Sequence, residues 1–268
     1  ILADLDVGGS NLATLFGAFE AGPDLGSFFS RDVAGLKDAI RPLRQNLSMI
    51  AGAGETLATA GPNWAMKRRL LRQLALLDAD VVLVDVGAGA GNHALDFWNA
   101  GDIRLIVTMP EPTASVDAYR FIKLATVRES VTRVPTRNPE RRTLERQDYK
   151  AANDLWKAVD LSGAASPNLP APIVPWVIVN QASDARRSFE RLQIVARRFL
   201  GRGLGFLGEI PRSTEVIESV SSFLPVVESA PNSEAAKAFH EIARKLDDEL
   251  TRTTISRTKD LTSIQELP

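Results

Sequence analysis

The hydrophobic residues of this chain fall into short uninterrupted runs, separated by longer segments with helical periodicity. Five runs are bounded by turn residues and show no alternation with polar residues: 1–5, 81–86, 103–109, 174–179 and 204–207. Runs of this kind are typical of strands that are covered on both faces, as in a parallel sheet. We therefore expect these five segments to form the sheet of the protein.

Amphipathic segments lie between the apolar runs. Residues 65–77 precede the run at 81–86, residues 114–126 follow the run at 103–109, and residues 184–200 follow the run at 174–179. The order strand, helix, strand with short connections predicts right-handed βαβ units in one sheet. The predicted fold class is therefore α/β, with a doubly wound and mostly parallel sheet.

The pattern lapses between residues 128 and 172, where Arg, Pro and Asn are frequent and one helix is expected at 144–159. We interpret this segment as a solvated surface insertion rather than a nucleic-acid-binding arm. Residues 234–250 again show helical spacing, and the polar tail 251–268 is expected to be frayed rather than a membrane anchor. We thus expect a single domain over residues 1–250.

The composition removes several kinds of site. The chain has no cysteine and only two histidines, His93 and His240. Disulfides, zinc–thiolate sites and cysteine nucleophiles are therefore excluded, and a multi-histidine metal centre or a Ser-His-Asp triad has almost nothing to be built from. The 32 basic and 33 acidic residues give a net charge of −1, which favours neither an anionic nor a cationic partner.

Acidic side chains follow two of the expected strands. Asp4 and Asp6 end the first run and precede glycines, and Asp85 ends the second run and precedes the sequence VGAGAG. Ligands of an open parallel sheet bind beyond the carboxyl ends of its strands, and Mg²⁺ prefers one or two carboxylates together with water and phosphate oxygens. A strand-end Asp is often only a helix cap. Two such acids on adjacent parallel strands are better evidence for a place that holds a metal or a water, because the strands bring both carboxylates to one edge of the sheet.

Two further features have less specific readings. Asn180 ends the run at 174–179, where its amide suits a purine edge but also suits a turn. The glycines at 203, 205 and 208 satisfy GxGxxG, but they follow a helix and lead into a strand, whereas a dinucleotide fingerprint follows a strand and opens a helix. From the residues alone a turn is the better reading of Asn180, and the GxGxxG run is not a dinucleotide site.

Four segments, in this order, resemble the MinD/ParA superfamily of P-loop ATPases. They are ILADLDVGGSNLATLFG, DADVVLVDVGAGAGNHALDFWNAGDIRLIVTMPEPTASVDAYRFIK, WVIVNQAS and LGFLGEIPRSTEVIESV. Within the superfamily the chain is most similar to the FlhG branch of MinD-like flagellar-number regulators, and PEPTASVDAYRFIK is the most discriminating part. The resemblance covers most of residues 1–126 and 173–250.

The resemblance implies a site for ATP and Mg²⁺. Asp6 matches the acid that positions the attacking water and supports the magnesium shell, and Asp85 matches the acid that holds Mg²⁺ through water. The other positions that it assigns to nucleotide binding in this part of the chain are Asp4, Asn11 and, facing the γ-phosphate, Gly89.

The resemblance also assigns the adenine contact to Asn180, with Pro211 and Arg212 in the loop that flanks the base. The family usually has an acid two residues after this proline, whereas this chain has Ser213. The base contact is therefore better supported at Asn180 than in the loop.

The phosphate-binding loop of the family, KGGxGKT, does not occur in residues 1–268. The family places it between a first strand and first helix, immediately before the strand expected at 1–5. We therefore expect the sequence to lack this first strand–loop–helix unit, and residues 1–268 alone not to hydrolyse ATP. The alternative is a degenerate ATPase that acts as a non-catalytic interaction module.

The resemblance implies a cytoplasmic ATPase that dimerises with ATP and recruits a regulatory or localisation protein, at a membrane surface or cell pole. Control of flagellar number or placement ranks first, and division-site positioning second. ParA-like DNA segregation is a further alternative, because four arginines share one side of the helix expected at 184–200 and its end. They would form a face for DNA, anionic lipid or an acidic partner, or simply a solvated surface: Arg187, Arg191, Arg198 and Arg202.

Overall fold

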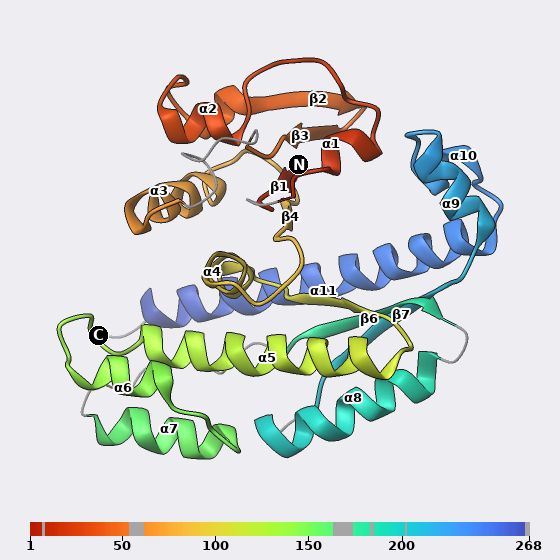
Figure 1. Ribbon diagram of the computed structural model, residues 1–268. Coiled ribbons are helices and arrows are strands. Elements are labelled where there is room, and N and C mark those ends of the chain that lie inside the picture. The colour runs from red at the N-terminus through yellow and green to blue at the C-terminus, as the bar shows by residue number, and fades with distance from the viewer. Residues whose placement is uncertain (7–8, 54–61, 163–173, 183–184, 202, 266–268) are drawn as a thin grey trace. The chain divides into compact units, whose positions relative to one another are not determined.

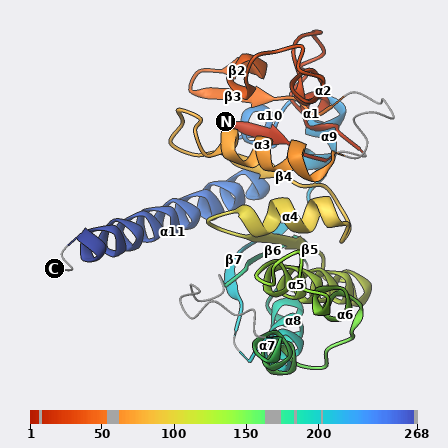
Figure 2. The ribbon, with the colours of Figure 1, turned by 90° about the vertical axis from the view of Figure 1, so that its left-hand side faces the viewer.

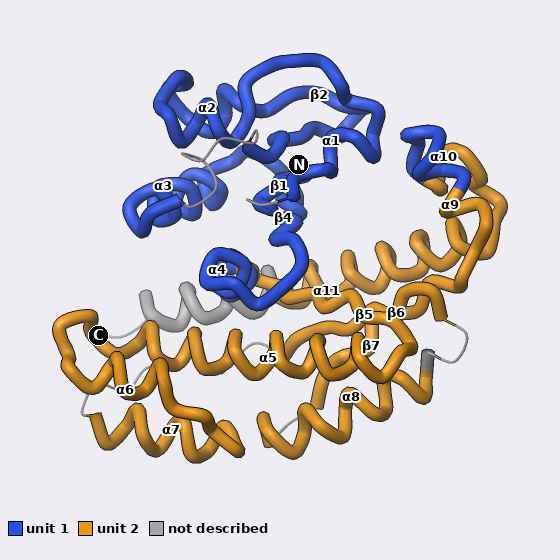
Figure 3. The backbone as a smooth tube through the Cα atoms, viewed as in Figure 1, with its two compact units in different colours: residues 1–100, 218–225 blue, residues 101–217, 226–268 orange. Residues whose placement is uncertain are grey.

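The computed structural model describes residues 1–6, 9–53, 62–162, 174–182, 185–201 and 203–265, and these form two compact units (Figure 3). The first unit contains residues 1–100 and 218–225, and the second contains residues 101–217 and 226–268. Each unit has its own sheet.

The first unit is built on a four-stranded sheet in the order β2-β3-β1-β4 (Figure 1). Strand β1 (Leu2–Asp4) pairs in parallel with both β3 (Leu47–Ile50) and β4 (Leu83–Asp85), and β2 (Ile40–Arg44) pairs antiparallel with β3. In this register Asp4 lies beside Asp85, so the carboxyl ends of β1 and β4 coincide.

Short helices surround this sheet, and two of them begin at side-chain caps. Asp24 accepts a hydrogen bond from the Ser27 N–H at 2.7 Å, and Asn63 accepts one from the Met66 N–H at 3.0 Å. Such caps satisfy N–H groups that have no partner within the helix. The helical elements are α1 (Leu12–Leu15), α2 (Leu25–Ser30), the 3₁₀-helix η1 (Leu36–Ala39), α3 (Trp64–Leu74) and α4 (Asn92–Ala100).

The second unit is built on a three-stranded parallel sheet in the order β5-β6-β7. Its strands are β5 (Leu105–Thr108), β6 (Trp176–Ala182) and β7 (Gly205–Pro211). Figure 2 shows α11 on one side of this sheet, with α5 and α8 on the other. The helices are α5 (Pro112–Thr132), α6 (Glu140–Arg146), α7 (Ala152–Leu161), α8 (Ala185–Leu200), α9 (Thr214–Ser221), α10 (Val226–Ser229) and α11 (Glu234–Gln265).

The α/β class with mostly parallel strands is confirmed, and each of the five predicted runs overlaps a strand. In the described structure these strands lie in two sheets, β1 and β4 in one and β5, β6 and β7 in the other, and not in the single sheet expected. The hairpin β2–β3 was not predicted. The expectation that the runs are covered on both faces is wrong for three strands, because Leu83 is 46%, Val107 62% and Phe206 37% exposed. Their strands, β4, β5 and β7, each lie at the end of a sheet, where one edge of the strand has no neighbour in the described structure.

The segment expected to be a surface insertion has its own packing. The single helix expected at 144–159 is wrong, because α6 and α7 are separate helices with residues 147–151 between them. Tyr149 lies in this connection, is 1% exposed and donates its hydroxyl to the Leu144 carbonyl at 3.2 Å. A buried side chain fixes the break between the two helices.

Helix α11 is described as far as Gln265, and the expectation of a frayed tail after residue 250 stays a prediction. The prediction of a single domain over residues 1–250, with an insertion at 128–172, stays a prediction. None of the described helices combines the length and the apolar composition needed to cross a membrane.

Candidate functional site

The carboxylate of Asp4 is buried at the end of β1 and holds the loop that follows. Its Oδ2 accepts hydrogen bonds from the Ser10 hydroxyl at 2.8 Å and from the Leu12 N–H at 3.1 Å. Its Oδ1 accepts one from the Asp6 N–H at 3.1 Å. Asp4 is only 1% exposed, and these three donors compensate for removing a carboxylate from water. Asp4 therefore orients the loop that carries Asp6.

Two residues that support this loop were missed by sequence reasoning. Ser10 bonds Asp4 directly, and Gly52, just after β3, leaves room for that bond. A Cβ at Gly52 would lie 2.1 Å from the Ser10 Oγ and 3.1 Å from the Asp4 Cγ. The only sequence signal was the GSN run after the acidic residues, which is also typical of an ordinary turn.

Asp85 ends β4 next to Asp4, but its surroundings are different. The Leu5 N–H bonds the Asp85 carbonyl at 2.7 Å and continues the pairing of the two strands. The Asp85 carboxylate is exposed, and its Oδ1 accepts a hydrogen bond from the Gly87 N–H at 2.9 Å. The backbone thus orients Asp85 while its carboxylate stays accessible to a ligand.

The Asp6 carboxylate lies directly against the loop after β4. Gly87 has a φ of +72°, and a Cβ there would lie 2.4 Å from the Asp6 Cγ. Only glycine combines this backbone conformation with so close an approach. The structure therefore brings Asp6 and the Asp85 loop together, as the strand order predicted from the sequence requires.

Two other predicted residues flank these acids. Gly89 has a φ of +94° and open space where a side chain would be. Asn11 precedes α1, is exposed, and makes no side-chain cap to that helix. Both residues are accessible from solvent.

The acids in this unit fit a hydrated magnesium ion better than a metal held by protein alone. Among the described residues, no three His, Asp or Glu side chains converge as a metal site. Asp85 is exposed and Asp6 lies across the Gly87 loop, so the donor set consists of carboxylate oxygens with room for water. Mg²⁺ usually keeps several waters and takes one or two carboxylates, which matches this arrangement.

The residues predicted to contact adenine lie in the second unit. Asn180 is in β6, and its Oδ1 accepts a hydrogen bond from the Gln181 N–H at 2.9 Å. The β6–β7 register shifts between Val179 and Ala182, and Ala182 then pairs with Pro211. Asn180 and Pro211 therefore lie at the same ends of neighbouring strands, with Arg212 exposed just beyond.

The first turn of α9, just after the loop that follows β7, contains an acid that sequence reasoning did not consider, Glu215. Ser213, at the position where the family usually has an acid, donates its hydroxyl to Glu215 Oε2 at 2.6 Å. This hydrogen bond holds the pKa of Glu215 below its ordinary value. The Val216 N–H is 3.4 Å from the Ser213 Oγ, so Ser213 also caps the start of α9.

The predicted arginine face lies on α8, where Arg187, Arg191 and Arg198 are exposed; Arg202 lies outside the described residues. Ile194 and Val195 share this exposed side and are 68% and 42% exposed. The opposite side of the helix is buried and contains Leu192, Ala196, Phe199 and Leu200. The exposed face is thus both basic and apolar.

No protein-family model matches this chain. Antiactivator FleN of Pseudomonas aeruginosa is 30% identical over 168 residues, which cover 63% of this chain and 46% of FleN. Flagellum site-determining protein YlxH of Helicobacter pylori is 32% identical over 123 residues, which cover 45% of this chain and 41% of YlxH. The chain therefore spans less than half the length of either relative.

An iron-sulfur cluster carrier protein of Deinococcus radiodurans is 24% identical over 264 residues, which cover 95% of this chain and 62% of that protein. Iron–sulfur clusters are held mainly by cysteine thiolates. Residues 1–268 contain no cysteine, so this relative gives no reason to assign a cluster to them.

Solved structures of ATPases share the fold. The cell division ATPase MinD of Pyrococcus furiosus has a TM-score of 0.62 at 19% identity and covers 92% of this chain and 85% of its own. MinD of Pyrococcus horikoshii, complexed with Mg-ADP, has a TM-score of 0.62 at 20% identity, with 94% and 84% covered. A ParA family ATPase from Chlorobium tepidum has a TM-score of 0.60 at 17% identity, with 91% and 84% covered.

The structural likenesses show the fold, and the chain is similar in sequence to FleN and YlxH over parts of their length. Together they confirm what the motifs indicate: this chain resembles the MinD/ParA superfamily of P-loop ATPases, on its FlhG branch.

Proposed function

We propose that residues 1–268 are part of an Mg²⁺-ATP-dependent switch that dimerises with ATP and acts in the number or placement of flagella. The observation that carries the proposal is the arrangement of Asp4, Asp6 and Asp85 at the carboxyl ends of β1 and β4. The likeness to YlxH supports the flagellar role. Because the chain spans less than half of YlxH, the proposal concerns the full-length protein.

Asp85 would hold the hydrated magnesium ion, because its carboxylate is exposed and is oriented by the Gly87 N–H. Mg²⁺, when bound, supplies positive charge that offsets the charge of the phosphate oxygens. Asp6 would accept a hydrogen bond from the attacking water and so orient it, while Asp4 keeps the Asp6 loop in place.

Asn180 would read the adenine edge, since an amide offers both a donor and an acceptor. Its Oδ1 already accepts a hydrogen bond from the Gln181 N–H, which orients the amide. Pro211 and Arg212 would flank the base from the neighbouring strand end. Residues 1–268 contain no KGGxGKT loop, so the loop that surrounds the β- and γ-phosphates is not assigned to them. Gly89, which has open space around it, would face the γ-phosphate.

The test is Mg-ATP hydrolysis by the full-length protein and by Asp6→Asn and Asp85→Asn. Removing a group that orients or activates the nucleophile costs about 10²-fold or more in rate, so both variants should lose most of the activity. Asp80→Asn is the matched control, because Asp80 is an exposed acid that precedes β4, on the side opposite to the carboxyl end where Asp85 lies. Unchanged hydrolysis in both site variants would exclude the assignment.

DNA binding is a second candidate, supported by the exposed Arg187, Arg191 and Arg198. Binding to phosphates should then be salt-dependent, and replacing two arginines should weaken it for every DNA sequence alike. The test is retention on non-specific duplex DNA in the presence of ATP. It compares the wild type with the double variant Arg187→Glu/Arg191→Glu. Equal retention of the two proteins would exclude the arginine face as the contact.

The interaction-module alternative predicts the same fold without hydrolysis. The Asp4 hydrogen bonds would be needed in either case, because they hold the loop. Asp85 accepts one hydrogen bond from its own loop, at the Gly87 N–H, but its carboxylate is still exposed, which favours the ATPase. If the full-length protein neither binds nor hydrolyses Mg-ATP, the module is the better account.

A further inference from the structure

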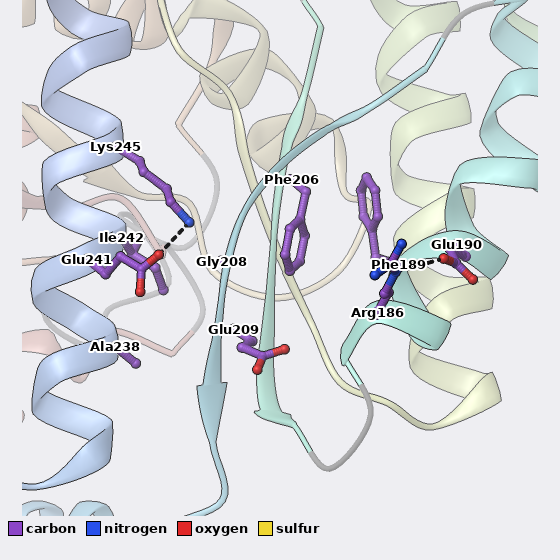
Figure 4. A pocket seen from close by; sticks show the side chains of 10 residues that line it. All are labelled: Arg186, Phe189, Glu190, Phe206, Gly208, Glu209, Ala238, Glu241, Ile242 and Lys245. Atoms are coloured by element: carbon purple, nitrogen blue, oxygen red, sulfur yellow. Dashed lines mark hydrogen bonds and ion pairs between the residues drawn. The ribbon is translucent and has the colours of Figure 1, made fainter.

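A groove with a volume of about 610 Å³ runs along β7 in the second unit, between α8 and α11 (Figure 4). It lies apart from Asn180 and Pro211, and the residues that line it have no role in the proposed nucleotide site. Helix α8 contributes Phe189, β7 contributes Phe206 and Glu209, and α11 contributes Ile242 and Lys245.

The backbone of β7 is unpaired on the groove side. In the described sheet β7 is an end strand and bonds only β6. The Gly205 N–H points to β6, where it bonds the Pro175 carbonyl at 2.9 Å. Successive residues of a strand direct their N–H and C=O groups to alternate sides, so those of Phe206 point away from β6. Such an edge is a template for another strand.

The two flanking helices leave this edge open. Gly208 allows α11 to pack closely, because a Cβ there would lie 2.6 Å from Ile242 Cγ1. On the other side, the rings of Phe189 and Phe206 pack with their centroids 4.8 Å apart. Phe206 is still 37% exposed, so the floor of the groove is apolar and aromatic.

The charges of the groove leave one carboxylate available. Arg186 pairs with Glu190 at 3.3 Å, and Lys245 pairs with Glu241 at 2.8 Å. Glu209 is exposed on β7, and no described residue forms an ion pair with it. The unpaired charge of the groove is therefore negative, and a cation on an incoming strand would complement it.

We propose that this groove binds an extended, basic peptide segment of a partner protein, which adds a strand to the free edge of β7. Main-chain hydrogen bonds to Phe206 would supply affinity, and side chains of alternate residues would supply specificity. An apolar side chain would pack on Phe206, and a Lys or Arg would face Glu209. The proposal does not depend on ATP binding, so the two proposals can fail separately.

A charged residue on an edge strand can also serve only to prevent aggregation. That role needs a charge of either sign, whereas a docking site for a basic strand needs the negative charge of Glu209. Reversing the charge at this position therefore separates the two, and Glu209 is exposed enough for Glu209→Lys to leave the fold intact.

The probe is a fluorescent peptide of about seven residues that alternates Val and Thr around a central Lys, a length typical of one strand. Fluorescence anisotropy with the full-length protein should show saturable binding. A peptide with central Glu should bind about fivefold to tenfold more weakly, because a cross-strand attraction becomes a repulsion. A peptide with central Pro should not bind, since proline breaks the ladder of hydrogen bonds.

Glu209→Lys should reverse this preference and bind the Glu peptide more tightly than the Lys peptide. Asp117→Lys is the matched control, because Asp117 is an exposed acid on α5 and outside the groove. It should leave both affinities unchanged. Absence of saturable binding to the wild type, or a preference that Glu209→Lys does not change, would overturn the proposal.

Discussion

Asp4 and Asp85 are neighbours in the sheet, but one is buried and the other exposed. The Asp4 carboxylate accepts three hydrogen bonds from its own loop. Asp85 accepts one hydrogen bond at Oδ1 from the backbone and faces solvent. At the scale of the residue, the same side chain thus acts as a structural anchor in one strand and as a candidate ligand in the next.

Asp4→Asn should destabilise the fold. The amide keeps the size of the side chain, but its NH₂ group would face donors that now bond a carboxylate oxygen. An unsatisfied buried hydrogen-bonding group costs about 1–3 kcal/mol, and urea unfolding measures this as a lower free energy of unfolding. Asp80→Asn, at an exposed position, should change it by less than about 0.5 kcal/mol. An equally small effect of Asp4→Asn would contradict the anchoring role.

Gly87→Ala should displace the Asp6 carboxylate. The added methyl would lie 2.4 Å from the Asp6 Cγ at a residue whose φ is +72°, so both the contact and the backbone conformation are unfavourable. We expect a cost of about 1–3 kcal/mol in unfolding free energy, together with a large loss of ATP hydrolysis. Gly91→Ala is the control, since a Cβ at Gly91 meets open space. Similar behaviour of the two variants would show that Asp6 does not depend on Gly87.

At the scale of the element, the strands in the short apolar runs were predictable and the hairpin β2–β3 was not. Strand β2 contains two arginines and Pro42, so it shows neither an apolar run nor a regular alternation. Asn46 has a φ of 59° in the turn, and asparagine is common at such positions. That single residue was the available signal, and it is too frequent in ordinary loops to predict a hairpin.

The separation of α6 from α7 was hidden for a similar reason. Helical periodicity continues across residues 144–159, but Gln147 has an extended conformation and Tyr149 packs inward. The burial of one aromatic side chain depends on contacts with other elements, which local pattern does not show. The strand-end acids were easier to predict, because strand order alone brings Asp4 beside Asp85.

Burial raises the pKa of the Tyr149 hydroxyl above its ordinary value of 10.0. The unfolded chain therefore loses this proton at a lower pH than the folded chain does. The contribution of Tyr149 to the free energy of unfolding is therefore fully present below pH 10. It should decrease as the pH rises above 10. Chemical unfolding of wild type and Tyr149→Phe between pH 8 and pH 11 measures this.

In Tyr149→Phe the decrease above pH 10 should be smaller. Near neutral pH the free energy of unfolding of the variant should be about 1 kcal/mol lower than that of the wild type, because the hydrogen bond to the Leu144 carbonyl is absent. Parallel curves for the two proteins across the whole range would show that Tyr149 is not the group responsible.

At the scale of the whole molecule, two kinds of information agree. The order of motifs indicates the MinD/ParA superfamily, and the sequence and structural likenesses confirm that resemblance. The sequence predicted the positions of the acidic strand ends but not the roles of Ser10, Gly52 and Gly87, which depend on loops that meet only after folding. The predicted nucleotide-binding residues are divided between the two units, with the acids in the first and Asn180 in the second.

The central claim is that Mg-ATP controls the association of the full-length protein. The most direct measurement is its molar mass by light scattering, without nucleotide and with Mg-ATP, for the wild type and Asp6→Asn. We expect the mass to double with Mg-ATP and to return to the monomer value as ATP is consumed. Asp6→Asn should remain a dimer, because it binds nucleotide but does not orient the attacking water. A mass that is the same with and without Mg-ATP would contradict the account.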